Sequence, residues 1–329
     1  MKFLRFIAVL FLLIGLLSLG MLITGNQHMF KGMWAVYLHG HKSATIDDYR
    51  FFDTRFIKAG DPSPLFKQKP ENKIQLSSTL RTTLDSCGTV AFLVLRNGKP
   101  LYEEYWEGYS DTSHSNSFSM AKTMVTMLTQ IAIQQGYFKS WDDKVSTYLP
   151  EIEGAYRNEL TLRHLSTMTA GLQWDESYSN PFGVTAKAYY GNNIEKLILN
   201  EVPVVNAPGE TFQYQSAATQ LLALCLIKVT GTSLSAYLQQ NLWTPMHAYQ
   251  NAFWQLDHKD GTELAYCCFN SNARDFARFG LLLMHHGRWG NHQILDSVFV
   301  NDMCQPQADP DYGMGIWVDY NDHVNPVYQ

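Results

Sequence analysis

The feature that most constrains the fold is a nearly all-apolar helical segment, residues 119–133, that directly follows two strand-like segments. A helix that is apolar on almost every face must be enclosed by other elements, so this segment predicts a central, buried helix that ends at Gly136. Before it, residues 89–95 and 101–106 flank Asn97-Gly98, a strong signal for a two-residue hairpin.

The remaining pattern is mostly helical and returns to a strand near the end. Thr161 is expected to cap a helix that begins at residue 162, and Gly231 to end another. Further helices are predicted over residues 193–199, 217–229, 234–242 and 273–286, with a short helix from residue 299 and a strand over 312–320. This order predicts an α+β fold: an antiparallel sheet (about 85–118 and 310–329) flanked by helices, with an inserted, mostly helical part (about 119–309).

The N-terminus carries an uncharged apolar run, residues 6–24, after Lys2 and Arg5. It is long enough to span a bilayer, and basic residues before it predict a cytoplasmic N-terminus. We expect a signal anchor over residues 1–25, with a cleaved signal peptide as the alternative. Residues 26–75 then form an N-terminal extension and 76–329 the main domain. This domain is expected to be periplasmic or otherwise extracytoplasmic, anchored in the inner membrane; the alternative is a secreted protein.

Charge and cysteine content exclude some functions. The formal charge is −5 and there is no basic tract, so nucleic acid is not an expected partner. Five cysteines cannot all pair within the chain; Cys225 lies in an apolar helix pattern and is expected to be a buried thiol, whereas the adjacent Cys267 and Cys268 cannot be assigned. No metal site is predicted, since zinc-type spacing is absent, and no cofactor is expected.

Ser119 and Lys122 are the first residues that indicate chemistry. They lie three positions apart at a predicted helix start, so both side chains lie on one helix face. An oxyanion formed at Ser119 would be stabilised by the helix N-terminus, and burial would lower the pKa of Lys122. About one Ser-x-x-Lys match is expected by chance. The alternative is that Ser119 only caps the helix and Lys122 extends its amine to solvent.

Tyr214 adds a third group, in a loop that follows the Pro208-Gly209 turn. A serine, a lysine and a tyrosine that meet in space can activate the serine hydroxyl for acyl transfer without a histidine. In this arrangement Tyr214 would be the base. The alternative is an ordinary loop tyrosine.

These strings together resemble the serine β-lactamase and penicillin-binding-protein superfamily, in particular its class C β-lactamase-like branch. The similarity covers about residues 80–320 and is carried by S-M-A-K at 119–122 and by residues 160–172, 208–216 and 272–280. Tyr-Gln-Ser in place of Tyr-x-Asn is closer to esterases and 6-aminohexanoate-dimer hydrolases than to true β-lactamases. The resemblance implies that Ser119 is acylated, that Lys122 and Tyr214 share acid and base duties, and that the Ser119 N–H forms half of the oxyanion hole.

Three further residues are expected to contact substrate. Ser216 ends the Tyr-Gln-Ser string, Tyr178 follows Asp175 and Glu176, and Asn270 precedes a predicted helix. The alternatives are a surface loop for Tyr178 and helix capping for Asn270.

The family's third motif, Lys-Thr-Gly or His-x-Gly, has no match here, so we expect the C-terminal strands to be missing. The predicted function is a serine hydrolase that forms an acyl-enzyme on a small or peptide-like amide or ester. The alternative is a non-catalytic binding or scaffold protein of the cell envelope that retains the fold.

Overall fold

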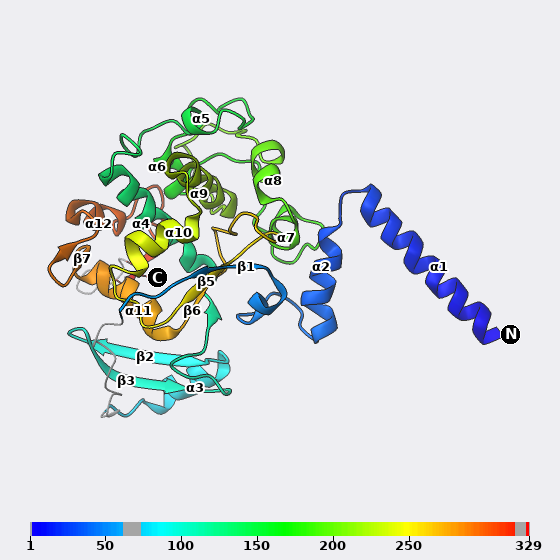
Figure 1. Ribbon diagram of the computed structural model, residues 1–329, viewed down its shortest axis with the longest axis horizontal. Coiled ribbons are helices and arrows are strands. Elements are labelled where there is room, and N and C mark those ends of the chain that lie inside the picture. The colour runs from blue at the N-terminus through cyan, green and yellow to red at the C-terminus, as the bar shows by residue number, and fades with distance from the viewer. Residues whose placement is uncertain (1, 62–73, 320–326, 329) are drawn as a thin grey trace.

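The computed structural model describes residues 2–61, 74–319 and 327–328 (Figure 1). The chain forms small antiparallel sheets surrounded by helices, as the α+β prediction requires. Its first elements are α1 (Lys2–Ile23), α2 (His28–Ala35), η1 (Tyr37–His39), η2 (Asp48–Phe51), β1 (Thr54–Ile57), α3 (Ser78–Ser86), β2 (Ala91–Arg96), β3 (Lys99–Tyr105) and β4 (Ser115–Asn116).

The later elements are mainly helical. They are η4 (Phe118–Met120), α4 (Ala121–Gln134), α5 (Val145–Tyr148), α6 (Leu162–Ser166), α7 (Val184–Tyr190), α8 (Ile194–Glu201), α9 (Ser216–Thr230), α10 (Leu234–Leu238), the π-helix η5 (Gln239–Trp243), β5 (Ala252–Gln255), β6 (Phe269–Ser271), α11 (Ala273–Met284), β7 (Arg288–Trp289), β8 (His292–Gln293), α12 (Ser297–Met303), β9 (Val318–Asp319) and β10 (Val327–Tyr328).

The largest sheet has the strand order β1-β5-β6-β4, and every pairing is antiparallel. Thr54 lies opposite Gln255 at one edge, and Asn116 lies opposite Asn270 at the other. This sheet differs from the predicted one. Its two inner strands lie within the range expected to be helical, and β1 comes from the segment expected to be an outer extension. Strands of two to four residues carry too little alternation to be recognised in sequence.

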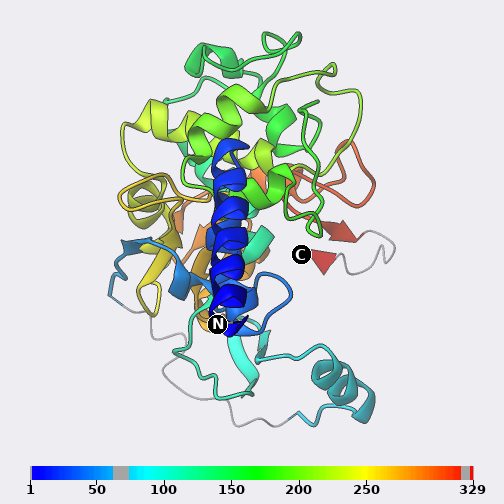
Figure 2. The same ribbon diagram turned by 90° about the vertical axis from the view of Figure 1, so that its right-hand side faces the viewer.

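The predicted hairpin is present, but it forms a separate sheet of β2 and β3. Asn97 and Gly98 both have positive φ, as a type I′ turn requires. Helix α3 lies beside the hairpin (Figures 1 and 2), and the Arg81 guanidinium donates to Tyr102 and Glu104 of β3.

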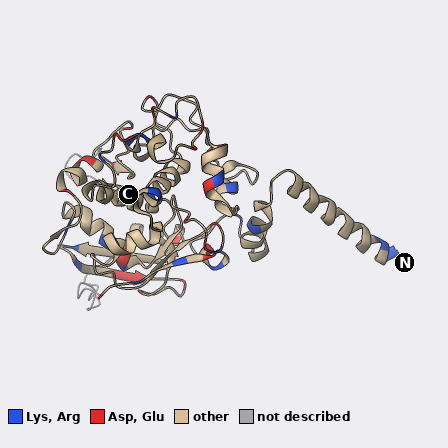
Figure 3. Cartoon of the chain, turned by 45° about the horizontal axis from the view of Figure 1, so that its top comes forward, with Lys and Arg blue, Asp and Glu red and all other residues tan. Residues whose placement is uncertain are grey.

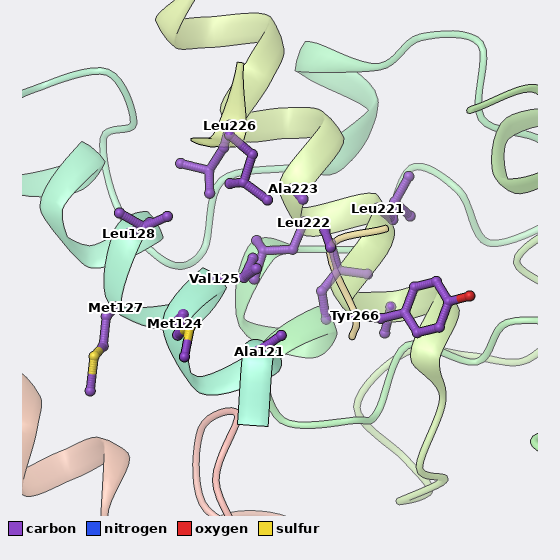
Figure 4. Close-up of a cluster of buried hydrophobic side chains, with 14 of the residues drawn as sticks. Ala121, Met124, Val125, Met127, Leu128, Leu221, Leu222, Ala223, Leu226 and Tyr266 are labelled. Carbon is purple, nitrogen blue, oxygen red and sulfur yellow. The ribbon is translucent and has the colours of Figure 1, made fainter. Parts of the chain in front are cut away.

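The core is built around α4 and α9, which pack against each other (Figure 4). Every α4 residue from Ala121 to Ala132 is buried, as the apolar pattern predicts. Every α9 residue from Ser216 to Leu226 is buried as well, and Cys225 is a fully buried free thiol, as expected.

Helix ends follow the local signals closely. The Thr161 hydroxyl accepts from the His164 N–H, Asn272 caps α11, and Gly231 ends α9 with φ +66°. The helix predicted over residues 234–242 differs, since its second half continues as the π-helix η5.

Among the described residues, α1 is the single unbroken helix that is long and apolar enough to cross a membrane; a signal sequence meets the same criterion. None of its residues is buried, and its charges lie only at its N-terminal end (Figure 3). Figure 1 shows α1 projecting from the body, with α2 between α1 and α7.

The segment 312–318 contacts both α4 and α6 through Gly315. The Gly315 N–H donates to Ser166 O at 2.8 Å, and the Thr123 hydroxyl donates to Gly315 O at 2.7 Å. Residues 318–319 form the short strand β9. Residues 320–326 of the predicted C-terminal strand region lie outside the described residues.

We expect Gly315→Ala to lower the free energy of unfolding by roughly 2–4 kcal/mol, because a left-handed backbone and a tight contact act together. Gly315 has φ +68°, and an added Cβ would lie 2.2 Å from the Thr126 hydroxyl oxygen. Gly231→Ala is the matched control: it has φ +66° and nothing within 4 Å, so only the backbone penalty applies. Denaturant unfolding of both variants measures the difference, and equal losses would contradict the close approach.

Candidate active site

Ser119 is positioned by the junction between β4 and α4. It lies in η4, the 3₁₀ turn that leads into α4. The Ser117 N–H donates to Phe269 O at 2.8 Å, and the Phe118 N–H donates to Asn116 Oδ1 at 2.9 Å. Phe118 has φ +44°, an uncommon backbone conformation for a residue with a side chain. The chain therefore turns sharply at a fixed point of the sheet just before Ser119.

Lys122 faces Ser119 across one helical turn, as the i,i+3 spacing predicts. Its Nζ donates to Ser119 Oγ at 3.1 Å and to Tyr266 O at 2.9 Å, and the side chain is 2% exposed. Burial lowers the pKa of Lys122 to about 8, while the charge of Glu176 acts in the opposite direction. About a tenth of this amine is therefore neutral, and able to accept a proton, at pH 7, and about half is neutral at pH 8.

Tyr214 completes the triad predicted from the sequence. Its ring stacks on Trp317 with 5.4 Å between centroids, and Lys122 Nζ lies 5.0 Å from the Tyr214 ring centroid. Burial raises the pKa of Tyr214 to about 12, although its hydrogen bond to Ser119 opposes that shift. The phenol is therefore protonated at neutral pH. This differs from the expected role of Tyr214 as the base and favours Lys122 as the proton acceptor.

Glu176 organises the side of the site next to Tyr214. Its carboxylate accepts from the Ser216 N–H at 2.7 Å, from the Ser216 hydroxyl at 2.6 Å and from the Tyr178 hydroxyl at 2.7 Å. The Trp174 indole N–H donates to the same carboxylate at 2.6 Å. Sequence analysis named Glu176 only as a neighbour of Tyr178, because its partners are brought together by the fold.

We expect Glu176→Gln to move the acidic limb of the pH–rate profile to lower pH. The negative charge of Glu176 raises the pKa of Lys122, so its removal makes the amine lose its proton more readily. Asp175→Asn is the matched control, because Asp175 is exposed and its carboxylate accepts from the Ser177 N–H. A pH profile that is unchanged in Glu176→Gln, or shifted equally in the control, would contradict this coupling.

A cavity of about 520 Å³ opens beside Ser119. Tyr178 and Ser216 also line it, so the structure brings five of the six predicted site residues to one place. Tyr178 is 73% exposed and stands at the cavity's edge. Ser216 is 2% exposed and both of its polar groups bond to Glu176, so it acts as a positioning residue more than as a substrate contact.

The prediction that Asn270 contacts substrate is not supported. Asn270 lies in β6, is fully buried, does not line the cavity, and donates through its side-chain amide to Cys268 O. Capping does not explain it either, because the α11 cap is Asn272. Three consecutive polar residues, 270–272, precede α11, so the sequence alone could not show which of them belong to a strand and which one caps the helix.

Two parts of the site were missed by sequence analysis. Tyr266 supplies the carbonyl that accepts from Lys122, and Trp317 supplies the ring that holds Tyr214. Cys267 and Cys268, which the sequence left unassigned, form a disulfide directly after Tyr266, and Cys267 lines the cavity. The Lys122–Tyr266 and Tyr214–Trp317 contacts each join segments about a hundred residues or more apart along the chain, which local patterns do not reveal.

Within residues 2–61, 74–319 and 327–328, no group of three or more His, Cys, Asp or Glu side chains could hold a metal ion. Glu176, whose charge acts on both Lys122 and Tyr214, already accepts four hydrogen bonds from protein groups. The candidate site therefore consists of the buried Lys122 amine and the Tyr214 phenol placed around the Ser119 hydroxyl.

Known proteins share this architecture. A 6-aminohexanoate-dimer hydrolase from Paenarthrobacter ureafaciens is 26% identical over 225 residues, which is 63% of this chain and 55% of that protein. The chain thus spans about half the length of this curated relative.

Among solved structures, a Bacillus anthracis protein assigned as a 6-aminohexanoate-dimer hydrolase superposes with a TM-score of 0.67 at 21% identity, covering 84% of this chain and 80% of that one. EstCE1, described as a hydrolase with promiscuous acyltransferase activity, superposes with a TM-score of 0.57 at 17% identity, covering 75% and 83%. The family model described as Beta-lactamase matches residues 76–322, three quarters of the sequence. The fold, the geometry around Ser119 and this match together show that the chain belongs to the beta-lactamase family.

Proposed function

We propose that this protein is a serine hydrolase that cleaves an amide or ester through an acyl-enzyme on Ser119. The observation that carries the proposal is the buried Lys122 amine, 3.1 Å from the Ser119 hydroxyl oxygen and with its pKa lowered to about 8. A neutral amine within hydrogen-bond reach of a hydroxyl is suited to take its proton.

The reaction would proceed in two stages. Ser119 Oγ attacks the substrate carbonyl while its proton passes to Lys122, and the Ser119 N–H at the start of α4 helps to stabilise the oxyanion. Tyr214, protonated at neutral pH, is placed to relay a proton to the leaving group. Water then attacks the acyl-enzyme, with the same two groups acting in reverse.

The substrate class follows from the relatives. The curated relative is named as a hydrolase of 6-aminohexanoate dimers, and EstCE1 is described as a hydrolase with acyltransferase activity. We assign this chain to the same amidase and esterase side of the family, in its class C-like branch, because Ser216 ends the Tyr-Gln-Ser string at the site.

The proposed location is a membrane surface outside the cytoplasm. Lys2 and Arg5 precede the apolar part of α1, which favours insertion with the catalytic domain on the far side of the membrane. A secreted protein that loses α1 is the alternative.

The test is the pH dependence of p-nitrophenyl acetate hydrolysis, with Ser119→Ala as the control. Because a neutral amine is the active form, the rate should rise as pH passes through about 8 and then level off. Ser119→Ala should lose this activity at every pH. A folded wild-type protein with no turnover of esters or amides would favour the non-catalytic binding role instead.

A further inference from the structure

Helix α2, which follows α1, lines part of the cavity beside Ser119. The cavity is lined on this side by Met29 and Met33 of α2 and by Val36, the C-cap of that helix. Tyr189 and Tyr190 of α7 line the same cavity. A volume of about 520 Å³ is suited to a small organic ligand. The α2 side of the lining is thus mostly apolar, with His28 as its polar member.

Helix α2 is fixed to the domain by specific contacts. His28 is buried and its Nε2 lies 2.9 Å from Pro181 O, and the Lys31 amine donates to Asp257 O at 3.3 Å. Gly32 lies against the Tyr190 ring, where an added Cβ would be 3.4 Å from a ring carbon. These contacts hold α2 against the domain, in the position where it lines the cavity beside Ser119.

Helix α2 also adjoins the apolar helix α1. Only residues 24–27 separate α1 from α2 (Figure 1). Trp34 and Tyr37 are 56% and 58% exposed, and Tyr37 also lines the cavity. Exposed aromatic residues next to an apolar helix are typical of a membrane–water interface.

The cavity lining also holds two buried polar atoms, His28 Nδ1 and the Tyr266 hydroxyl, that have no hydrogen-bond partner among the described residues. A buried hydroxyl without a partner is costly, so a ligand with a polar linkage would fit here better than a pure hydrocarbon.

We propose that the substrate is a membrane-resident amphiphile whose apolar acyl chain lies along α2 and whose ester or amide carbonyl reaches Ser119. This rests on the proposed hydrolase function and on α1 remaining attached. Ser119 Oγ adds to the carbonyl carbon to give a tetrahedral oxyanion, whose collapse breaks the bond to the leaving oxygen or nitrogen and leaves the acyl group on Ser119. The serine proton passes to Lys122, Tyr214 relays a proton to the leaving group, and water then releases the fatty acid and restores the hydroxyl.

The experiment compares p-nitrophenyl acetate, octanoate and palmitate as substrates of the full chain in phospholipid vesicles. The kcat/KM should rise from acetate to octanoate by about tenfold for roughly every two methylenes that enter the cavity. Equal rates for acetate and octanoate, or a preference for acetate, would overturn the acyl-chain proposal and leave the hydrolase intact. No turnover of any of the esters would overturn both.

Variants of α2 test this part of the lining directly. Met33→Asp should lower the ratio of kcat/KM for octanoate to kcat/KM for acetate by about tenfold or more, and its circular dichroism spectrum reports correct folding. Met33→Trp, which fills the cavity without adding charge, should move the preference to shorter chains. Leu38→Asp is the control, because Leu38 is exposed and does not line the cavity; a loss of octanoate selectivity in this control as large as in Met33→Asp would contradict the proposal.

Discussion

Replacing Lys122 with methionine is expected to reduce the rate of Ser119 acylation by about 10²–10⁴. Methionine has nearly the same length as lysine but cannot accept a proton, so the hydroxyl loses its base while the cavity keeps its shape. The rate is measured with p-nitrophenyl acetate and with a fluorophosphonate that reacts at serine.

The same substitution should leave the melting temperature within a few degrees of wild type, because two effects oppose each other. The lowered pKa of the buried Lys122 corresponds to roughly 3 kcal/mol against the charged amine, which methionine removes. Leaving Tyr266 O without its donor costs about 1–3 kcal/mol. Lys139→Met, at an exposed lysine, is the control for activity. A Lys122→Met enzyme that retains wild-type rates would exclude the amine as the base.

Replacing Tyr214 with phenylalanine is expected to slow hydrolysis by about 10² or more, since the phenol is the second group that can move a proton at Ser119. The ring should remain in place, because its stacking on Trp317 and its contact with the Lys122 amine do not need the hydroxyl. The measurement is kcat for an ester and for an amide, since the poorer leaving group of an amide should make the loss larger.

Tyr237→Phe is the matched control for Tyr214→Phe. It also removes a phenolic hydroxyl, one that donates to Gln135 at 2.8 Å, and neither residue lines the cavity beside Ser119. Its activity should stay within about twofold of wild type. Equal losses in the two variants would indicate a general effect of removing a hydroxyl and would contradict a specific role for Tyr214.

What the sequence could predict was local. The buried helix, the Asn97-Gly98 turn and the caps at Thr161 and Gly231 each depend on neighbouring residues, and each is present in the structure. The pairing of Ser119 with Lys122 is local too, because three residues along a helix return to one face.

What the sequence could not predict depends on contacts between distant segments. The strands β5 and β6 become recognisable only through their pairing, and Asn270 was misassigned as a substrate contact for that reason. Glu176 and Trp317 join the site through partners far along the chain, and so does the α2 wall of the cavity. The choice between Lys122 and Tyr214 as base needed burial, which shifts their pKa values in opposite directions.

The central claim is that Ser119 is a nucleophile activated by Lys122. Its most direct test is intact-mass and peptide-mapping analysis of the full chain after reaction with a fluorophosphonate, at pH values on both sides of about 8. We predict a single adduct on the peptide containing Ser119, faster above pH 8 than below it, and absent from Ser119→Ala. A folded protein that remains unlabelled, or one that is labelled at another residue, would contradict the account.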